Sequence, residues 1–429
     1  MDLHVFFQHE VKPALGCTEP GAVAYAAGVA ASHMAGPPRH IHLRLSANIY
    51  KNGTSVGIPG TDGLKGNLFA AALGALGGDP DRGLQSLEHL TPESIARARA
   101  MLEAVQVTQE VVGEVPSVYA EVELLREGES VTAILAHRHD NIVEIRRNGR
   151  TVPVAPDEGD DAAQGQLTGV PAYLRELGRT PFAELWADAG RIDADLEAFL
   201  LEGAAMNLAV AEAGLAEPWG LGVGHCLHEQ FGKESLLMRV KAHTAAAADV
   251  RMAGGTMPVM SSAGSGNHGL TAIIPPAVAA REWGPPPREL AEALALSHLV
   301  TGAVKAGTGR LTPVCGCTVA AGSGAAAALV RLSGGNARQA ESAVAYVISS
   351  LMGMLCDGAK ASCALKVSTA AGEALTAATL ALHGGILESR EGVVGPDFLG
   401  NTAAVGEISG IGFSAVDATI LRLLDDAGR

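Results

Sequence analysis

Residues 312–332 read TPVCGCTVAAGSGAAAALVRL: a turn that holds two cysteines, then a run of mostly small, apolar side chains. Because alanine is the strongest helix former, this run predicts a helix over 318–332. Further Ala- and Leu-rich stretches are separated by glycine-containing loops, at 193–214, 289–302, 337–354 and 365–383. Strand patterns are scarce among them. The sequence therefore predicts a mostly all-α domain over residues 166–429, whose small side chains let the helices pack closely.

The N-terminal part of the chain has a different pattern. Apolar and polar residues alternate in four stretches, which predicts β-strands at 40–50, 118–125, 131–137 and 142–147. Asn52-Gly53 predicts a hairpin turn after the first of them, and helices are expected to start near Gly21 and Leu68. The prediction for residues 1–165 is an α+β domain, an antiparallel sheet with helices. The acidic, turn-rich residues 154–167 are the expected linker.

Composition and charge restrict the partners that the protein can have. Apolar residues make up 48% of the 429 positions, enough for a sizeable core, while aromatic residues make up only 4%. The net charge of −15 argues against a nucleic-acid partner, because binding to phosphate backbones depends on clustered Lys and Arg. No stretch has the pattern of a membrane span or a secretory signal. We therefore expect a cytoplasmic homo-oligomer with a small-molecule ligand and no nucleic-acid or membrane partner.

The six cysteines are too sparse for a disulfide framework, and four of them form two local pairs. Cys315 and Cys317 flank a glycine, while Cys356 and Cys363 lie in the turn-rich sequence CDGAKASC. Thiolates held by turns on a helical scaffold are what an iron–sulfur cluster requires, and the spacing is not that of a structural zinc site. The same residues would also serve as small buried apolar side chains. Spacing alone does not separate these two interpretations.

Cys17 stands apart in LGCTEPGAVAY, residues 15–25, directly before an expected helix. Backbone N–H groups and the dipole at a helix start can lower the pKa of a thiol, which would make Cys17 a usable base or ligand. A buried cysteine that only begins the helix is the alternative.

Two glycine-rich loops are candidates for binding an anion. GIPGTDGLKGN at 57–67 and SSAGSGNHG at 261–269 could present backbone N–H groups to a substrate carboxylate, although ordinary turns are the alternative for either loop.

The lysines in apolar stretches are expected to extend to the surface; these are Lys241, Lys305, Lys360 and Lys366. Lys360 differs from the others because it lies between two candidate ligand cysteines.

Several of these segments together resemble one known family. GCTEP at 16–20 and CDGAK-x-x-CALK at 356–366 are specific, and three more segments add to them: GIPGTDGLKG, AGSGNHGLTAIIPP and CGCTVAAG, at 57–66, 263–276 and 315–322. On these motifs the chain is similar to the L-cysteine desulfidase family. That family is related to the iron–sulfur L-serine dehydratases through a domain like their alpha chain. The resemblance covers most of the chain, from about residue 8 to residue 413.

This resemblance implies an oxygen-sensitive [4Fe-4S] cluster that three cysteines hold, with the fourth iron open to substrate. The ligands are expected from the CDGAK-x-x-C motif and the CGC pair: Cys356, Cys363 and Cys315, with Cys317 as the alternative to Cys315. Cys17 matches the residue that accepts a proton in the family. These assignments come from matching motifs and await the geometry of the site.

The implied reaction removes sulfide from L-cysteine by β-elimination. Cys17 takes the α-proton, a Lewis-acidic iron polarises the leaving sulfur, and aminoacrylate then hydrolyses to pyruvate and ammonia. Side chains of the second glycine-rich loop are expected to bind the carboxylate and ammonium of the substrate: Ser261, Ser262, Asn267 and His268. Cys226 matches no motif and is expected to be structural.

Three other functions remain open at the level of sequence. An iron–sulfur L-serine dehydratase would use the same scaffold, but the six residues between Cys356 and Cys363 are fewer than in the related dehydratases and favour the desulfidase. A pyridoxal-phosphate lyase would use Lys241 and the loop at 265–269, without the usual flanking pattern. A non-enzymatic iron–sulfur or thiol sensor, or an amino-acid binding protein, would need neither an open iron nor Cys17.

Overall fold

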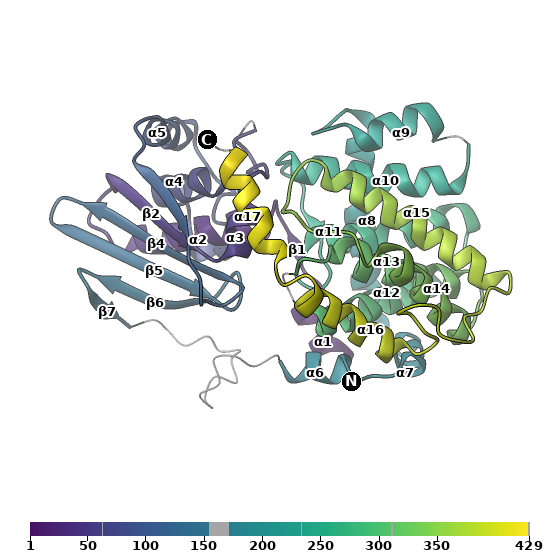
Figure 1. Ribbon diagram of the computed structural model, residues 1–429. Helices are drawn as coiled ribbons and strands as arrows, with labels where there is room; N and C mark the ends of the chain where they lie inside the picture. Colours follow the sequence, from purple (N-terminus) through teal and green to yellow (C-terminus); the bar gives the residue numbers. More distant parts are fainter. Residues whose placement is uncertain (62, 154–170, 233, 310–311, 428–429) are drawn as a thin grey trace.

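Figure 1 shows the protein as a computed structural model that describes residues 1–61, 63–153, 171–232, 234–309 and 312–427. A sheet with helices and a bundle of helices lie side by side. The predicted fold class, an α+β region followed by a mostly helical one, is confirmed. The predicted domain boundary after residue 165 and the predicted linker fall within 154–170, apart from the described residues, and stay predictions.

The larger sheet has six strands in the order β3-β2-β4-β5-β6-β7. Their bounds are β2 (His40–Leu45), β3 (Val107–Val111), β4 (Tyr119–Arg126), β5 (Glu129–Ala136), β6 (Ile142–Arg147) and β7 (Arg150–Val152). Neighbouring strands are antiparallel, as predicted, except β2 and β3, which run parallel. The helices between these two strands supply the long crossover that a parallel pair needs.

Helices cover one face of this sheet. They are α2 (Thr18–Ser32), α3 (Ala47–Gly53), α4 (Asn67–Gly77), η1 (Pro80–Gln85) and α5 (Pro92–Glu103). α2 and α4 pack directly on the strands, where Leu43 and Val122 are fully buried. Because side chains alternate along a strand, the residues between these apolar ones point to the opposite face.

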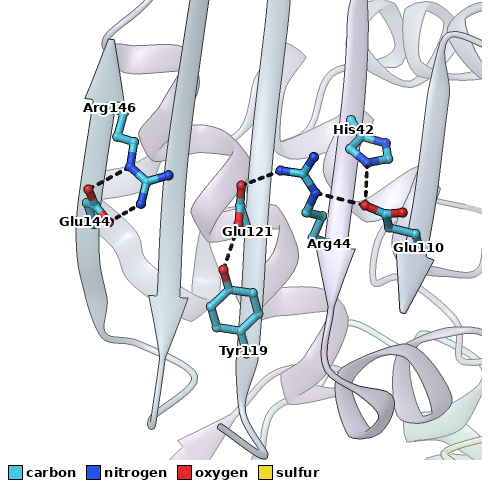
Figure 2. Close-up of polar contacts among 7 residues, drawn as sticks. All are labelled: His42, Arg44, Glu110, Tyr119, Glu121, Glu144 and Arg146. Carbon is cyan, nitrogen blue, oxygen red and sulfur yellow. Dashed lines mark hydrogen bonds and ion pairs between the residues drawn. The ribbon is translucent and has the colours of Figure 1, made fainter. Parts of the chain in front are cut away.

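That opposite face carries polar contacts, shown in Figure 2. Glu144 and Arg146 pair within β6. Hydrogen bonds and ion pairs link five further side chains across β4, β2 and β3, in the order Tyr119, Glu121, Arg44, Glu110 and His42. These side chains are partly exposed, so the contacts favour this strand order but add little to stability.

The hairpin turn predicted at Asn52-Gly53 is wrong, because both residues lie in α3. This helix starts directly after β2, where the Ser46 hydroxyl caps it by accepting a hydrogen bond from the Ile49 N–H at 3.3 Å. The side chain of Asn67 occupies the space that a Cβ on Gly53 would fill. A close approach between two helices therefore explains this glycine.

The second part is a helical bundle built around α13 (Gly316–Leu332). The other helices are α6 (Ala172–Leu177), α7 (Phe182–Ala189), α8 (Ala194–Ala216), α9 (Val223–Phe231), α10 (Leu236–Met252), α11 (Gly266–Trp283), α12 (Pro287–Thr308), α14 (Ala337–Leu351), α15 (Cys363–Leu382) and α16 (Phe398–Glu407), which continues into η3 (Ile408–Gly412). α13 packs against α11, α12, α14 and α15. A Cβ on Gly324 would overlap the backbone of α12 at Ser297, so small residues let these helices approach closely, as predicted.

Both ends of the chain cross from one part to the other. Phe6 and Phe7 of α1 (Leu3–Glu10) are buried in the core of the bundle, and β1 (Pro13–Ala14) pairs with β8 (Val259–Met260). At the other end, α17 (Val416–Ala427) lies against α3 in the sheet-containing part (Figure 1). The first and last segments therefore hold the two parts together.

By length and composition α8 could cross a membrane. It is the single such helix in the described ranges, unless the bent pair of α16 and α17 counts as one span. α8 packs against α10, α11 and α12, and half of its apolar stretch is buried. These are also the properties of a core helix in a bundle.

Candidate functional site

The two cysteine-containing turns of the bundle are joined through their backbones. The Cys315 N–H donates to the carbonyl of Met354 at 2.8 Å, and the Cys356 N–H donates to the carbonyl of Pro313 at 2.7 Å. Cys315 is also the residue that precedes the first turn of α13. This pairing brings the thiols of Cys315 and Cys356 within hydrogen-bonding distance of each other.

Cys17 and Cys363 meet at the contact between the two parts of the molecule. Cys363 is the first residue of α15, and its thiol faces the carbonyl of Gly358 at 3.7 Å. Cys17 precedes α2 and forms a small buried cluster with Val56 and Met252, against which Cys363 packs. The GCTEP and CDGAK-x-x-C motifs, more than 300 residues apart, therefore share one apolar cluster.

The start of the first glycine-rich loop lies at the same place. The Gly57 N–H donates to the carbonyl of Met252 at 3.1 Å, and a Cβ on Gly57 would overlap the backbone at Ala253. This glycine is therefore required for the close approach of the loop to the end of α10. The contact places Val56 against Cys17.

The donor set at the paired turns fits an iron–sulfur cluster. A hydrogen bond with Cys317, together with burial, raises the pKa of Cys315 to about 12, and a hydrogen bond with Cys315 and burial raise the pKa of Cys356 well above its usual value. Burial also raises the pKa of Cys363. These three thiols do not readily lose their protons while they lie close together. A bound cationic group would replace the protons and stabilise the three thiolates.

In the described part of the chain, no three Cys, His, Asp or Glu side chains are grouped closely enough to hold a single metal ion. Cys317 packs partly against the hydrophobic core of the bundle, and its thiol bonds that of Cys315, so the structure does not separate the two members of the pair.

Cys17 is held as a neutral thiol. Its S–H donates to a carboxylate oxygen of Glu19 at 2.9 Å, and both side chains are buried. Burial raises the pKa of Cys17 well above its usual value; the negative charge of Glu19 raises it further, and Arg251 acts in the opposite direction. The expectation that the helix start lowers this pKa is therefore wrong, because burial and Glu19 outweigh the helix dipole.

Two of the four predicted substrate-binding residues, Ser261 and Ser262, use their hydroxyl groups to fix the loop. The Ser261 hydroxyl accepts a hydrogen bond from the Lys12 N–H at 3.1 Å, and the Ser261 N–H donates to the Lys12 carbonyl at 2.9 Å. The Ser262 hydroxyl bonds Nδ1 of the buried His298 at 2.8 Å. Ser261 therefore ties the loop to β1, and Ser262 ties it to α12.

The other two, Asn267 and His268, lie in the first turn of α11. The Asn267 amide oxygen accepts a hydrogen bond from Arg251 at 3.0 Å, and its NH₂ group faces the Met252 sulfur at 3.5 Å. A Cβ on Gly316 would lie only 2.6 Å from Nε2 of His268, so His268 reaches the CGC turn directly. Burial, and then the charge of Lys305, lower the pKa of His268 to about 3, so its ring is neutral.

Three buried cations surround this site, and the sequence motifs did not identify them as site residues. Lys51 acts on the pKa of Cys356, Arg251 on that of Cys17, and Lys305 on that of His268. Lys305 was expected to reach the surface, which is wrong, because it is only 6% exposed and lies beside Gly316. A cation in an apolar helix is the one sequence signal that could have indicated burial.

The remaining lysines have other surroundings. Lys360 and Lys366 both pair with Asp357 and, although burial acts the other way, hold the pKa of that carboxyl at about 2. They fasten the CDGAK turn to α15. Lys241 lies eleven residues before Met252 on α10, about 16 Å along the helix axis. Cys226 is exposed on α9.

Comparison with known proteins gives one consistent family. The sequence profile described as serine dehydratase alpha chain matches residues 81–422. The chain is 59% identical over 449 residues to a UPF0597 protein of Nitratidesulfovibrio vulgaris (strain DSM 19637 / Miyazaki F), covering 99% of each chain. It is 40% identical over 424 residues to one of Desulfotalea psychrophila, covering 97% of this chain and 96% of the relative. It is 38% identical over 430 residues to one of Clostridioides difficile (strain 630), covering 98% of each.

Proposed function

The chain belongs to the serine dehydratase alpha chain family, and on that basis we propose that it is an L-cysteine desulfidase. The family supports a lyase-type enzyme with an iron–sulfur group. The proposed reaction is the β-elimination of sulfide from L-cysteine. The observation that carries the proposal is the shared apolar cluster of Cys17 and Cys363, since it joins the proposed proton acceptor to the proposed metal site.

Cys315, Cys356 and Cys363 would hold the [4Fe-4S] cluster, with Cys317 as the alternative to Cys315. When bound, this group would supply a Lewis acid that polarises the leaving sulfur. The buried Lys51 beside Cys356 and the helix starts at Cys315 and Cys363 favour negative charge on these thiolates.

Cys17 is proposed to take the α-proton of the substrate. It must first give up its own proton, and the Glu19 carboxylate at 2.9 Å is positioned to accept it. Loss of the α-proton and of the Cβ–S bond leaves aminoacrylate, with the bonding electrons leaving on sulfide. Tautomerisation and hydrolysis of aminoacrylate then give pyruvate and ammonia.

Asn267 and the neutral His268 are proposed to orient the substrate, while Ser261 and Ser262 hold their loop in place.

The choice of L-cysteine over L-serine rests on two observations. Val56 and Met252 make the surroundings of Cys17 apolar, which suits a thiol better than a strongly hydrated hydroxyl group. Cys356 and Cys363 also have the short spacing of the desulfidase motif. An L-serine dehydratase is the second candidate, because the matching family profile is described by that activity.

The test begins with protein purified without oxygen. Iron content and the visible spectrum would be recorded, and sulfide and pyruvate would be assayed together with L-cysteine and then with L-serine. We expect about four irons per chain and equal amounts of both products from L-cysteine. Faster turnover of L-serine would favour the dehydratase. Protein that stays free of iron after anaerobic reconstitution would contradict the cluster, and absorption typical of pyridoxal phosphate would direct attention to Lys241.

Three variants separate the roles of the cysteines. Cys17→Ala should keep the iron and lose turnover by roughly 10²- to 10⁴-fold, the range for loss of a general base. Cys356→Ala should lose both iron and turnover. Cys226→Ala is the matched control and should keep both, because this cysteine is exposed and outside the site.

We also propose that the protein works in the cytoplasm, where thiols stay reduced, and that it forms a homo-oligomer. Light scattering would test the second point by comparing the mass in solution with the 43.7 kDa of one chain.

A further inference from the structure

Arg251 is a buried arginine with an unused hydrogen-bond donor. It lies in the last turn of α10 with 3% of its surface exposed. One terminal nitrogen donates to the amide oxygen of Asn267 at 3.0 Å, while Nε is buried and has no acceptor among the described residues. Leaving a charged donor buried and unsatisfied is costly, so an acceptor from outside the chain would be favoured there.

The side chain also has no carboxylate partner among the described residues. Within the described ranges, no Asp or Glu lies at ion-pair distance from Arg251; the nearby Asp249 accepts a hydrogen bond from Gly224 of α9 instead. Buried charges in proteins are normally paired. A ligand that carries a carboxylate would supply the missing partner and could accept two parallel hydrogen bonds from the guanidinium.

Arg251 lies between the Cys17 cluster and the second glycine-rich loop. Its neighbour Met252 belongs to the cluster with Cys17, and the charge of Arg251 acts on both Cys17 and His268. A Cβ on Gly266 would overlap Nε and Cζ of Arg251. The glycine at this position therefore lets the guanidinium pack directly against the start of α11.

We propose that Arg251 binds the α-carboxylate of the substrate. This inference rests on the proposed function and makes it more specific: the substrate must be an α-amino acid with a free carboxylate. Thiols without that group, such as cysteamine or a cysteine ester, would not be held with their α-hydrogen toward Cys17. Asn267 then acts as a positioning residue that fixes the guanidinium through the bond at 3.0 Å.

The test measures binding separately from turnover. Anaerobically purified protein would be titrated by calorimetry with L-alanine, which has no leaving group, and with L-alaninamide, which lacks the carboxylate. Wild-type protein should bind L-alanine more tightly. Arg251→Gln should weaken L-alanine binding by roughly 100-fold and abolish the difference between the ligands. Arg251→Lys should keep part of the difference, because it retains a charge without the planar fork.

Arg281→Gln is the matched control, since Arg281 is half exposed and pairs with Glu212 on the bundle surface. It should bind both ligands as wild type does. Circular dichroism and thermal unfolding would show whether Arg251→Gln is folded. If it is not, the comparison of wild type with Arg251→Lys decides the question, and equal preference for L-alanine in these two proteins would overturn the proposal.

Other outcomes also decide between the two proposals. Wild-type protein that binds both ligands equally, or neither, would overturn the role of Arg251. Discrimination that Arg251→Gln retains would overturn it as well, even if L-cysteine is turned over. The protein could also prefer L-alanine over L-alaninamide through Arg251 and yet show no lyase activity. That result would support a carboxylate site and contradict the proposed desulfidase function.

Discussion

Glu19 controls how readily Cys17 loses its proton. The carboxylate accepts the thiol hydrogen at 2.9 Å, and its negative charge raises the pKa of Cys17 beyond the effect of burial. Glu19→Gln should therefore lower this pKa. The pH dependence of Cys17 alkylation by iodoacetamide, followed by mass spectrometry in iron-free protein, should move to lower pH.

The control for this measurement is Glu110→Gln, which removes a carboxylate from the outer face of the sheet, away from Cys17. It should leave the alkylation profile unchanged. A profile that stays in place or moves to higher pH in Glu19→Gln would contradict the role assigned to Glu19.

His298 makes the folded protein sensitive to acid. Its ring packs edge-on against Phe7, bonds Ser262 and is almost fully buried, and burial lowers its pKa to about 3. The unfolded chain, with a histidine pKa of about 6.5, binds a proton below that pH while the folded chain does not. The free energy of unfolding therefore falls as pH drops from 6.5 toward 3, by about 2 kcal/mol at pH 5 for this residue.

Denaturant unfolding at pH 7 and pH 5 would measure this effect. Wild-type protein should lose about 2 kcal/mol more between these pH values than His298→Gln does. His383→Gln, which changes an exposed histidine, should behave as wild type does. Equal losses in wild type and His298→Gln would show that His298 is protonated in the folded state.

At the scale of elements, the CDGAK turn depends on one glycine. Gly358 has a φ of +99°, a conformation that side chains disfavour, and a Cβ there would overlap the carbonyl oxygen of Lys51 in α3. Gly358→Ala should lower the free energy of unfolding by more than about 1 kcal/mol. Because the turn carries Cys356, the iron bound after anaerobic reconstitution should fall as well.

Gly353→Ala provides the comparison, since it lies five positions earlier and a Cβ there would meet open space. Denaturant unfolding and iron analysis of both variants would be run side by side. Similar stability and iron content in the two variants would mean that the turn tolerates a side chain at Gly358.

Most elements could be predicted because their signals are local. Alternation identified β2, β4, β5 and β6, and alanine-rich runs identified the long helices of the bundle. The prediction at Asn52-Gly53 was wrong because this dipeptide occurs both in hairpin turns and at close contacts between helices. Which of the two forms here depends on Asn67, which is distant in sequence. The parallel pairing of β2 and β3 likewise depends on tertiary packing and not on the pattern of either strand.

The candidate site could be predicted only in part. Motifs pointed to Cys17, Cys356 and Cys363, which the structure brings to one region. The buried Arg251 and Lys305 could not be predicted, because burial of a cation depends on which helices surround it. The sequence also did not predict the hydrogen bonds that the hydroxyls of the second loop make with Lys12 and His298.

At the scale of the whole molecule, one ion pair connects the end of the chain to the sheet-containing part. Lys51 and Asp417 are 2.5 Å apart, with side-chain exposures of 1% and 24%. Asp417→Ala would leave the Lys51 ammonium buried without its partner, and should lower the free energy of unfolding by about 3 kcal/mol. The double variant Lys51→Met with Asp417→Leu should regain most of this loss, because an apolar pair of similar volume replaces two desolvated charges.

Denaturant unfolding of Lys51→Met, Asp417→Leu and the double variant would give the coupling energy, with Asp417→Ala measured beside them. The control is Glu388→Ala, which breaks an exposed pair with Arg338 and should cost less than about 1 kcal/mol. A similar cost for Asp417→Ala would mean that α17 contributes little to joining the two parts.

The crossed ends of the chain impose an order on synthesis. α1 is translated before the sheet, yet the bundle that buries Phe6 and Phe7 is translated only after the entire sheet. α17 is translated after the bundle, and this helix packs on α3, which precedes most of the sheet. The nascent chain therefore cannot complete its native contacts domain by domain.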